Sequence, residues 1–278
     1  MANLDRKVDA GSLIAAFILI ASSKVFALTS LVYIDPGHTL EFPGSIGACG
    51  TQEVFVNDAL AGQLGAALRA DGIRVEFSRP PNDDKSKIAP HDGRETPEAL
   101  KARGEKANTL GANLFISIHH DSIDEKMMTT DVNACPGQNI ANPQVISQEF
   151  LSRPDVQVGF NIFFMRNPER PLKTERSLSF ARMIGAEFVK LNEVPSTYHI
   201  PQYEPSCSSC KIEDRNLGVM SRTLGVLRET KMPSVLVEVT NLRIEKEEIN
   251  ANNPAHQAQI VQGLKAAIKS YFESLPKK

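Results

Sequence analysis

Apolar and polar positions alternate in blocks along the chain, and these blocks predict strands and helices in turn. Short runs rich in β-branched and aromatic residues predict strands at residues 31–34, 73–77, 114–118, 159–165, 224–227 and 234–239. Longer stretches with helical apolar spacing predict helices at residues 53–70, 96–110, 144–151, 175–191 and 256–272. Because helices alternate with short apolar strands, we expect an α/β fold with a parallel sheet flanked by helices.

Histidines follow two of the predicted strands. The run at 31–34 breaks into an Asp-Pro-Gly turn and then His38, and the run at 114–118 ends in His119 and His120. The carboxyl ends of strands in an open α/β sheet border a crevice where binding and catalytic groups collect. Since alternate strand residues face opposite sides of a sheet, only one of His119 and His120 is expected to share this crevice with His38.

Two glutamates complete a candidate metal site at the crevice. Glu53 opens the helix after His38, and Glu238 is the one acid in the apolar run 234–239. Catalytic zinc commonly takes two histidines and a carboxylate and keeps a fourth position for water. His38, Glu53 and His119 form such a set. Glu238 has the position of a working acid or base, because a buried carboxylate must be paired, protonated or functional.

Each of these residues also has an ordinary structural interpretation. Glu53 can serve only as a helix-start acid that complements the helix dipole, and Glu238 can pair with Arg228. His120 competes with His119 as the ligand. The histidines at positions 91, 199 and 256 are interpreted as surface residues. The prediction of a metal site therefore depends on the combination of residues.

Two segments interrupt the alternation of strands and helices. Residues 122–157 contain Cys135 and have only the short helical pattern at 144–151, and residues 195–215 form a second irregular segment. A connection as long as residues 122–157 is either a lid over the site or a surface excursion. The sequence has no internal repeat or linker, so residues 28–278 are expected to form one catalytic domain.

The first 27 residues have the pattern of a secretory signal peptide. A basic head with Arg6 and Lys7 precedes an uncharged apolar run at 11–21, and small residues near Ala27 suit cleavage. The run is shorter than the ~20 apolar residues of a transmembrane helix. We therefore expect cleavage, no stable membrane span afterwards, and export to the periplasm or cell envelope; an uncleaved membrane anchor is the alternative.

The net charge argues against one class of partner, and the cysteines indicate disulfides. The net charge of -2, without a block of Lys or Arg, argues against binding to nucleic acid. Export makes disulfides the first interpretation of Cys49, Cys135, Cys207 and Cys210, which allow three pairings. For the Cys207-Ser-Ser-Cys210 spacing, a disulfide is favoured over metal or redox chemistry because a second pair of that kind is missing.

Four ordered motifs resemble one enzyme family. The sequences IDPGH, SIHHD and VLRETKMPSVLVEV, with a glutamate 15 residues after His38, resemble the zinc-dependent N-acetylmuramoyl-L-alanine amidases, which cut peptidoglycan and include the cell-division amidases. The similarity covers nearly all of the chain from Leu31 onward. It implies a mostly parallel, roughly six-stranded sheet, peptidoglycan as substrate and Zn²⁺ as cofactor. It further implies His38, Glu53 and His119 as zinc ligands and Glu238 as the catalytic acid/base.

The resemblance also implies a reaction and a form of regulation. The expected enzyme hydrolyses the amide bond between N-acetylmuramic acid and L-alanine of the stem peptide, in cell-wall remodelling or daughter-cell separation. In the cell-division members an inserted helix can plug the zinc site until a protein activator withdraws it. The resemblance predicts that residues 122–157 act as such an insert here, with Glu149 as the plugging residue. The alternatives are an exported zinc carboxypeptidase and a catalytically silent wall-binding or regulatory protein.

Overall fold

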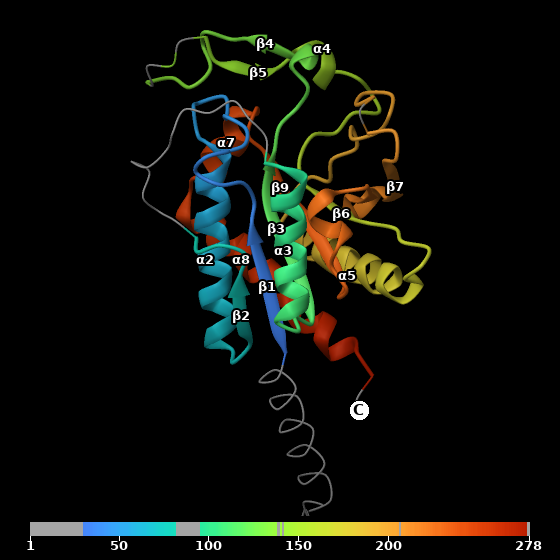
Figure 1. The fold of residues 1–278 in the computed structure, drawn as a ribbon. Helices are drawn as coiled ribbons and strands as arrows, with labels where there is room; N and C mark the ends of the chain where they lie inside the picture. The colour runs from blue at the N-terminus through green and yellow to red at the C-terminus, as the bar shows by residue number, and fades with distance from the viewer. Residues whose placement is uncertain (1–29, 82–94, 138–139, 141, 206, 277–278) are drawn as a thin grey trace, which may run out of the picture.

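A seven-stranded sheet runs through the molecule in the order β2-β1-β3-β9-β6-β8-β7 (Figure 1). The computed structural model describes residues 30–81, 95–137, 140, 142–205 and 207–276. The strands are β1 (Leu31–Pro36), β2 (Arg74–Phe77), β3 (Leu114–Asp121), β6 (Asn161–Phe164), β7 (Lys211–Asp214), β8 (Val219–Ser221) and β9 (Ser234–Asn241). β2, β1, β3 and β9 are parallel, β6 is antiparallel to β9, β8 is parallel to β6, and β7 is antiparallel to β8.

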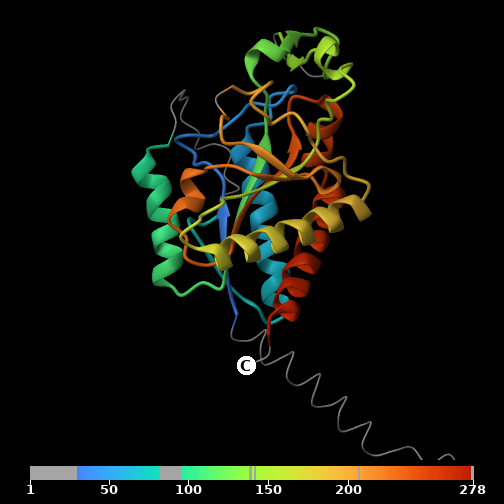
Figure 2. The same ribbon diagram turned by 90° about the vertical axis from the view of Figure 1, so that its right-hand side faces the viewer.

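Helices cover both faces of this sheet (Figures 1 and 2). They are α2 (Glu53–Ala70), α3 (Pro97–Thr109), α4 (Gln148–Leu151), α5 (Pro171–Lys190), α6 (Gly225–Arg228), α7 (Glu245–Ala251) and α8 (Pro254–Ser274). Apolar residues of α2, α5 and α8 pack with one set of strand residues, and those of α3 and α6 pack with the other set. Within the described part of the chain, no helix is long and apolar enough to cross a membrane.

Local sequence signals explain where the helices beside the site begin. The Thr96 side chain accepts a hydrogen bond from the backbone of Ala99, and Pro97 occupies the first turn of α3, as a helix start favours. Glu53 is the first residue of α2, and that helix ends at Asp71 and Gly72, with Gly72 in the left-handed conformation. The helix boundaries expected from the sequence at these points are confirmed.

The described residues of the segment 122–157 include a small hairpin at one end of the molecule (Figure 1). β4 (Met128–Thr130) pairs antiparallel with β5 (Gln144–Ile146), and the short α4 follows. Ile146 and Phe150 pack against Tyr198 and Tyr203 of the irregular segment that precedes β7. The two segments that interrupt the sequence pattern therefore contact each other.

The four cysteines lie in two pairs at disulfide distance. Cys49, in the loop before α2, has its Cα 5.5 Å from that of Cys135 in the hairpin segment. The Cα atoms of Cys207 and Cys210 are 5.2 Å apart. The first pair joins the hairpin segment to the loop that leads into Glu53.

The α/β fold with a mostly parallel sheet is confirmed, with several local corrections. The main sheet has seven strands where roughly six were expected, because β7 and β8 were not expected and the strand expected at residues 224–227 does not form. Of the run at 224–227, Leu224 is the N-cap residue of α6 and residues 225–227 lie in that helix, and residues 144–146 form β5 and not the start of a helix. Ser147 explains the second error, since its side chain accepts a hydrogen bond from Phe150 and caps α4 at that point. Residues 1–27, the expected signal peptide, lie outside the described residues.

Candidate functional site

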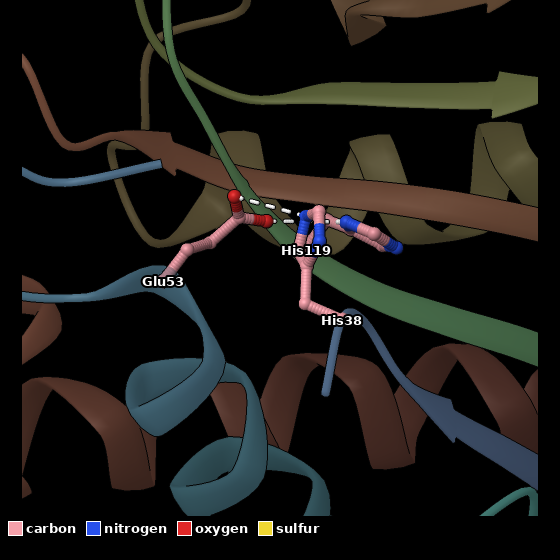
Figure 3. Close-up of side chains that lie close together, drawn as sticks. All are labelled: His38, Glu53 and His119. Atoms are coloured by element: carbon pink, nitrogen blue, oxygen red, sulfur yellow. Dashed lines mark hydrogen bonds and ion pairs between the residues drawn. The ribbon is translucent and has the colours of Figure 1, made fainter. Parts of the chain in front are cut away.

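Three side chains from distant parts of the sequence converge at the carboxyl ends of β1 and β3 (Figure 3). His38 follows β1, Glu53 opens α2, and His119 lies on β3. His38 Nε2 is 3.1 Å from Glu53 Oε2, and His119 Nδ1 is 3.1 Å from Glu53 Oε1. One nitrogen or oxygen atom from each residue falls within 4.8 Å of the others, which is close enough for the three to share a metal ion.

The backbone around His38 is held in an uncommon conformation. His38 has a φ of +67°, in the left-handed region that few residues other than glycine adopt. Its carbonyl oxygen accepts hydrogen bonds from Arg79 Nε at 2.7 Å and from Arg103 Nη2 at 3.3 Å. Arg103 is itself paired with the buried Asp35 at 3.0 Å. Two arginines therefore hold the peptide that presents His38.

Two glycines make room for the converging side chains. A Cβ atom on Gly37 would lie 2.5 Å from the ring of His119. A Cβ atom on Gly44, whose φ is +78°, would lie 2.5 Å from Glu53 Oε2 and 2.6 Å from the ring of His38. These distances are shorter than any tolerable contact, so glycine is required at both positions.

Glu53 is 3 % exposed and is surrounded by hydrogen-bond donors. Its carboxylate accepts hydrogen bonds from the Ser45 backbone at 3.0 Å, the Ser45 hydroxyl at 2.9 Å, the His120 backbone at 3.2 Å and the Asn57 amide at 3.3 Å. Burial alone would raise its pKa, but the charge of His38 and hydrogen bonds with both histidines hold the pKa well below its usual value. Glu53 therefore stays ionised, as a metal ligand must be.

His120 points to the other side of β3. Its Nδ1 lies 2.8 Å from the amide oxygen of Asn57 on α2, and burial lowers its pKa to about 3. The neutral ring thus packs between β3 and α2. Of the two neighbouring histidines, the structure brings only His119 together with His38 and Glu53.

Glu238 lies on β9 beside this group. It pairs with His119 of β3 on one side and with Asn161 of β6 on the other. Burial raises the pKa of Glu238 well above its ordinary value, and the negative charges of Asp121 and Glu53 raise it further. Arg228, considered above as an ion-pair partner, is exposed; the arginine whose charge acts on Glu238 is Arg222.

A buried chain of charged residues beside Glu238 was not expected from the sequence. His199 is 4 % exposed, so its interpretation as a surface residue was wrong. His199 Nε2 lies 2.7 Å from Asp121 Oδ2, and its Nδ1 lies 2.7 Å from Glu204 Oε2. Glu204 Oε1 accepts a hydrogen bond from Arg222 at 2.9 Å, and the Tyr198 hydroxyl donates to Asp121. The one sequence signal was the histidine itself, in a segment without a helical or strand pattern.

Glu149 lies outside the group of converging side chains. It is on α4, its side chain is 89 % exposed, and its nearest charged partner is Arg153 at 3.9 Å. This conformation gives Glu149 no contact with His38, Glu53 or His119 among the described hydrogen bonds and ion pairs. Its role as a plug stays a prediction.

The residues present suit a zinc ion. Two imidazoles and one carboxylate are the donor set that catalytic zinc takes in proteins, and Gly37 and Gly44 leave the space that the converging rings need. Asn57, Ser45 and the His120 backbone orient the carboxylate, as the residues around a metal ligand commonly do. The fold and site therefore define an α/β protein with a candidate metal centre and an adjacent glutamate.

Comparison with known proteins identifies the family. Residues 32–270 match the family model described as N-acetylmuramoyl-L-alanine amidase (Amidase_3), so the chain belongs to this family. It is 24% identical over 255 residues to N-acetylmuramoyl-L-alanine amidase AmiC of Escherichia coli O6:H1, covering 87% of this chain but 52% of AmiC. It is also 24% identical over 246 residues to a putative N-acetylmuramoyl-L-alanine amidase of Buchnera aphidicola, covering 86% of this chain and 95% of that protein. The chain thus spans about half the length of AmiC and nearly all of the Buchnera protein.

Solved structures support the same fold. The amidase Ami1 of Mycobacterium smegmatis superposes with a TM-score of 0.59 at 19% identity, over 90% of this chain and 99% of that one. An N-acetylmuramoyl-L-alanine amidase from Clostridium difficile 630 gives a TM-score of 0.56 at 23% identity, over 89% and 98% of the two chains. The likeness extends over most of each chain, which confirms a single α/β domain of this architecture.

Proposed function

We propose that this protein is a zinc-dependent amidase that cleaves peptidoglycan at the amide bond between N-acetylmuramic acid and L-alanine of the stem peptide. The observation that carries the proposal is the convergence of His38, Glu53 and His119, with Glu238 paired to His119 in the sheet. Membership of the amidase family supports hydrolysis of this bond. It does not favour the carboxypeptidase or the silent protein considered from the sequence.

His38, Glu53 and His119 are the proposed zinc ligands. When bound there, zinc would polarise the scissile carbonyl and lower the pKa of a water molecule toward ~7. The chain contributes the position of each ligand. Arg79 and Arg103 hold the His38 peptide, and the hydrogen bonds to Glu53 leave its carboxylate ionised and fixed in direction.

Glu238 is the proposed general acid/base. As a carboxylate it accepts a proton from the attacking water, and it then returns that proton to the nitrogen of the leaving L-alanine. Its raised pKa suits both steps, because a carboxylate in such surroundings binds a proton more tightly than one in water and holds it until the amine leaves. Its partial exposure keeps it accessible to substrate.

The cellular setting is part of the proposal. Residues 1–27 act as a cleaved signal, residues 28–278 form the exported catalytic domain, and the enzyme works in the periplasm or cell envelope on the peptidoglycan of that compartment. Residues 122–157 border the site and are the segment that a protein activator would move. The sequence pattern of the N-terminus and the contact between this segment and Tyr198 support these assignments.

Digestion of purified peptidoglycan tests the function directly. Zinc-loaded protein is incubated with peptidoglycan, with and without a chelator, and the released fragments are identified by mass spectrometry. We expect free stem peptides that begin with L-alanine, lost with chelator and restored by added zinc. Release of single amino acids from the end of the stem would indicate a carboxypeptidase, and no release under any condition would overturn the amidase assignment.

A further inference from the structure

We propose that Arg222 binds a carboxylate of the stem peptide beside the bond that Glu238 acts on, and so selects stems that carry a negative charge near the cleavage point. This inference rests on the proposed amidase function and deepens it. It concerns a residue outside the three zinc ligands and the catalytic glutamate.

The sheet places Arg222 and Glu238 on the same face, one row of side chains apart. Glu238 pairs with Asn161 of β6, and Phe163 lies two residues further along β6, on the same face as Asn161. The guanidinium carbon of Arg222, which follows β8, lies 5.7 Å from the centre of the Phe163 ring. Arg222 therefore lies over Phe163, which is one row of side chains away from the Glu238–Asn161 pair.

A chain of hydrogen-bonded charges fixes Arg222 in this position. Arg222 Nη2 donates to Glu204 at 2.9 Å, Glu204 lies 2.7 Å from His199, and His199 lies 2.7 Å from Asp121. The His199 ring also meets the Phe163 ring edge-on, with centroids 5.3 Å apart. The chain begins at the buried Asp121, two residues from His119, and ends at Arg222, whose side chain is 25% exposed. It thus connects the interior beside the metal site to a cation at the surface.

The charges along this chain leave its outer end suited to an anion. The carboxylates of Asp121 and Glu204 alternate with His199, whose pKa rises to about 9 because the two carboxylates outweigh the effect of burial. Glu204 is thus shared between two cations. A guanidinium has five N–H donors. Among the described residues, that of Arg222 makes one side-chain hydrogen bond, to Glu204, so donors are left for the paired contacts that a carboxylate accepts.

The lengths of extended chain agree with this placement. Two residues along a strand span about 7 Å, and two residues of an extended peptide span about the same length. With the L-alanine nitrogen at Glu238, a carboxylate on the second residue of the stem reaches Arg222.

Two soluble muropeptides that differ at one group test the inference. In one, the second stem residue is D-glutamate with a free α-carboxylate; in the other it is D-isoglutamine, in which that carboxylate is an amide. We expect the zinc-loaded wild-type protein to prefer the carboxylate. In Arg222→Gln, kcat/KM on the carboxylate substrate should fall at least about tenfold, equal to about 1.4 kcal/mol, while the amide substrate changes little. Arg222→Lys should keep part of the preference.

Arg166 supplies a matched control. It follows β6, donates from Nε to Glu213 at 2.7 Å and lies 5.7 Å from the ring centre of Phe164, which belongs to the core on the other face of the sheet. Arg166→Gln removes the same kind of arginine–glutamate pair and should leave the preference unchanged.

The outcomes separate this inference from the proposed function. Equal loss on both substrates in Arg222→Gln, with hydrolysis by the wild type intact, would show a structural role and overturn the inference alone. A wild type without any preference would also overturn it. Hydrolysis of neither substrate by the wild type would overturn the amidase assignment and this inference together. Thermal unfolding shows whether each variant is folded. If Arg222→Gln is not, Arg222→Lys decides: a reduced preference for the carboxylate substrate supports the inference, and an unchanged preference overturns it.

Discussion

Arg79 Nε donates to the backbone carbonyl oxygen of His38 at 2.7 Å, although 41 residues separate them in the sequence. A second donor of the same guanidinium lies 3.2 Å from the carbonyl of Gly37, and an ion pair with the buried Asp58 holds the group in place. These contacts fix two consecutive peptides at the point where His38 takes its left-handed conformation. Arg79 thus controls the direction of a proposed zinc ligand without touching the metal site.

We predict that Arg79→Lys weakens zinc binding by about tenfold, because a lysine can keep its charge beside Asp58 but cannot hold both carbonyls with a rigid fork of donors. Competition with a chromophoric chelator measures the dissociation constant. Arg74→Lys, at an exposed position on β2, is the control and should bind zinc like the wild type. Equal affinity in the two variants would contradict this role of Arg79.

The strongly apolar strands could be predicted from the sequence, and the weak ones could not. β1, β3 and β9 are buried on both faces, so their residues form continuous apolar runs. β7 lies at the edge of the sheet and reads KIED, which has no strand pattern, and β8 has three residues. Residues 224–227 form an apolar run too short to distinguish a strand from a helical turn.

The three converging side chains could be predicted from the sequence, but the charged residues around them could not. His38, Glu53 and His119 each stand at the end or start of a recognisable element, so the topology of a parallel sheet predicts that they meet. His199 lies in an irregular segment, and its partner Asp121 is 78 residues away. Such a contact depends on tertiary packing, and no local sequence pattern predicts it.

The stability of the protein should depend on pH through His199. Burial alone would lower its pKa, but Asp121 and Glu204 raise it to about 9, above the ~6.5 of an unfolded chain. The stabilisation that results from protonation of His199 is therefore complete below about pH 6.5 and is lost as pH rises toward about 9. We expect the difference in unfolding free energy between wild type and His199→Gln to shrink over that range by up to about 3 kcal/mol. Urea denaturation at several pH values measures it; a constant or growing difference would contradict the prediction.

The two cysteine pairs should differ in their effect on stability. The residues of the Cys49–Cys135 pair are 86 positions apart, and those of the Cys207–Cys210 pair are 3 apart. Closing the longer loop restricts the unfolded chain more, so replacing Cys49 and Cys135 by serine should lower the unfolding free energy by about 2–4 kcal/mol, and replacing the second pair by less. Alkylation without reduction, followed by mass spectrometry, should label no cysteine in the wild type. Labelling of Cys49 would show that its disulfide is absent.

The role of Glu149 is best tested by a single substitution. Deletion of residues 122–157 would expose Tyr198 and Tyr203, which pack against the hairpin. A change in activity after this deletion could then result either from removal of a plug or from the loss of packing. Glu149 is 89 % exposed, so Glu149→Ala should leave the fold intact. Because Glu149 makes no described hydrogen bond or ion pair with His38, Glu53 or His119, we expect Glu149→Ala to hydrolyse peptidoglycan and bind zinc like the wild type. Faster hydrolysis in Glu149→Ala would instead support the plug expected from the family resemblance.

Replacement of Glu238 separates proton transfer from metal binding. Glutamine keeps the shape of the side chain and its place between His119 and Asn161, but it cannot accept the proton of the attacking water. We expect Glu238→Gln to bind zinc with wild-type stoichiometry and to lose about 10²- to 10⁴-fold in kcat. Glu76→Gln, at an exposed position on β2, should keep both properties. Zinc content is measured on the purified protein, and turnover is measured as stem-peptide release from peptidoglycan. Turnover near the wild-type rate in Glu238→Gln would remove this residue from the mechanism and require another proton acceptor beside His119.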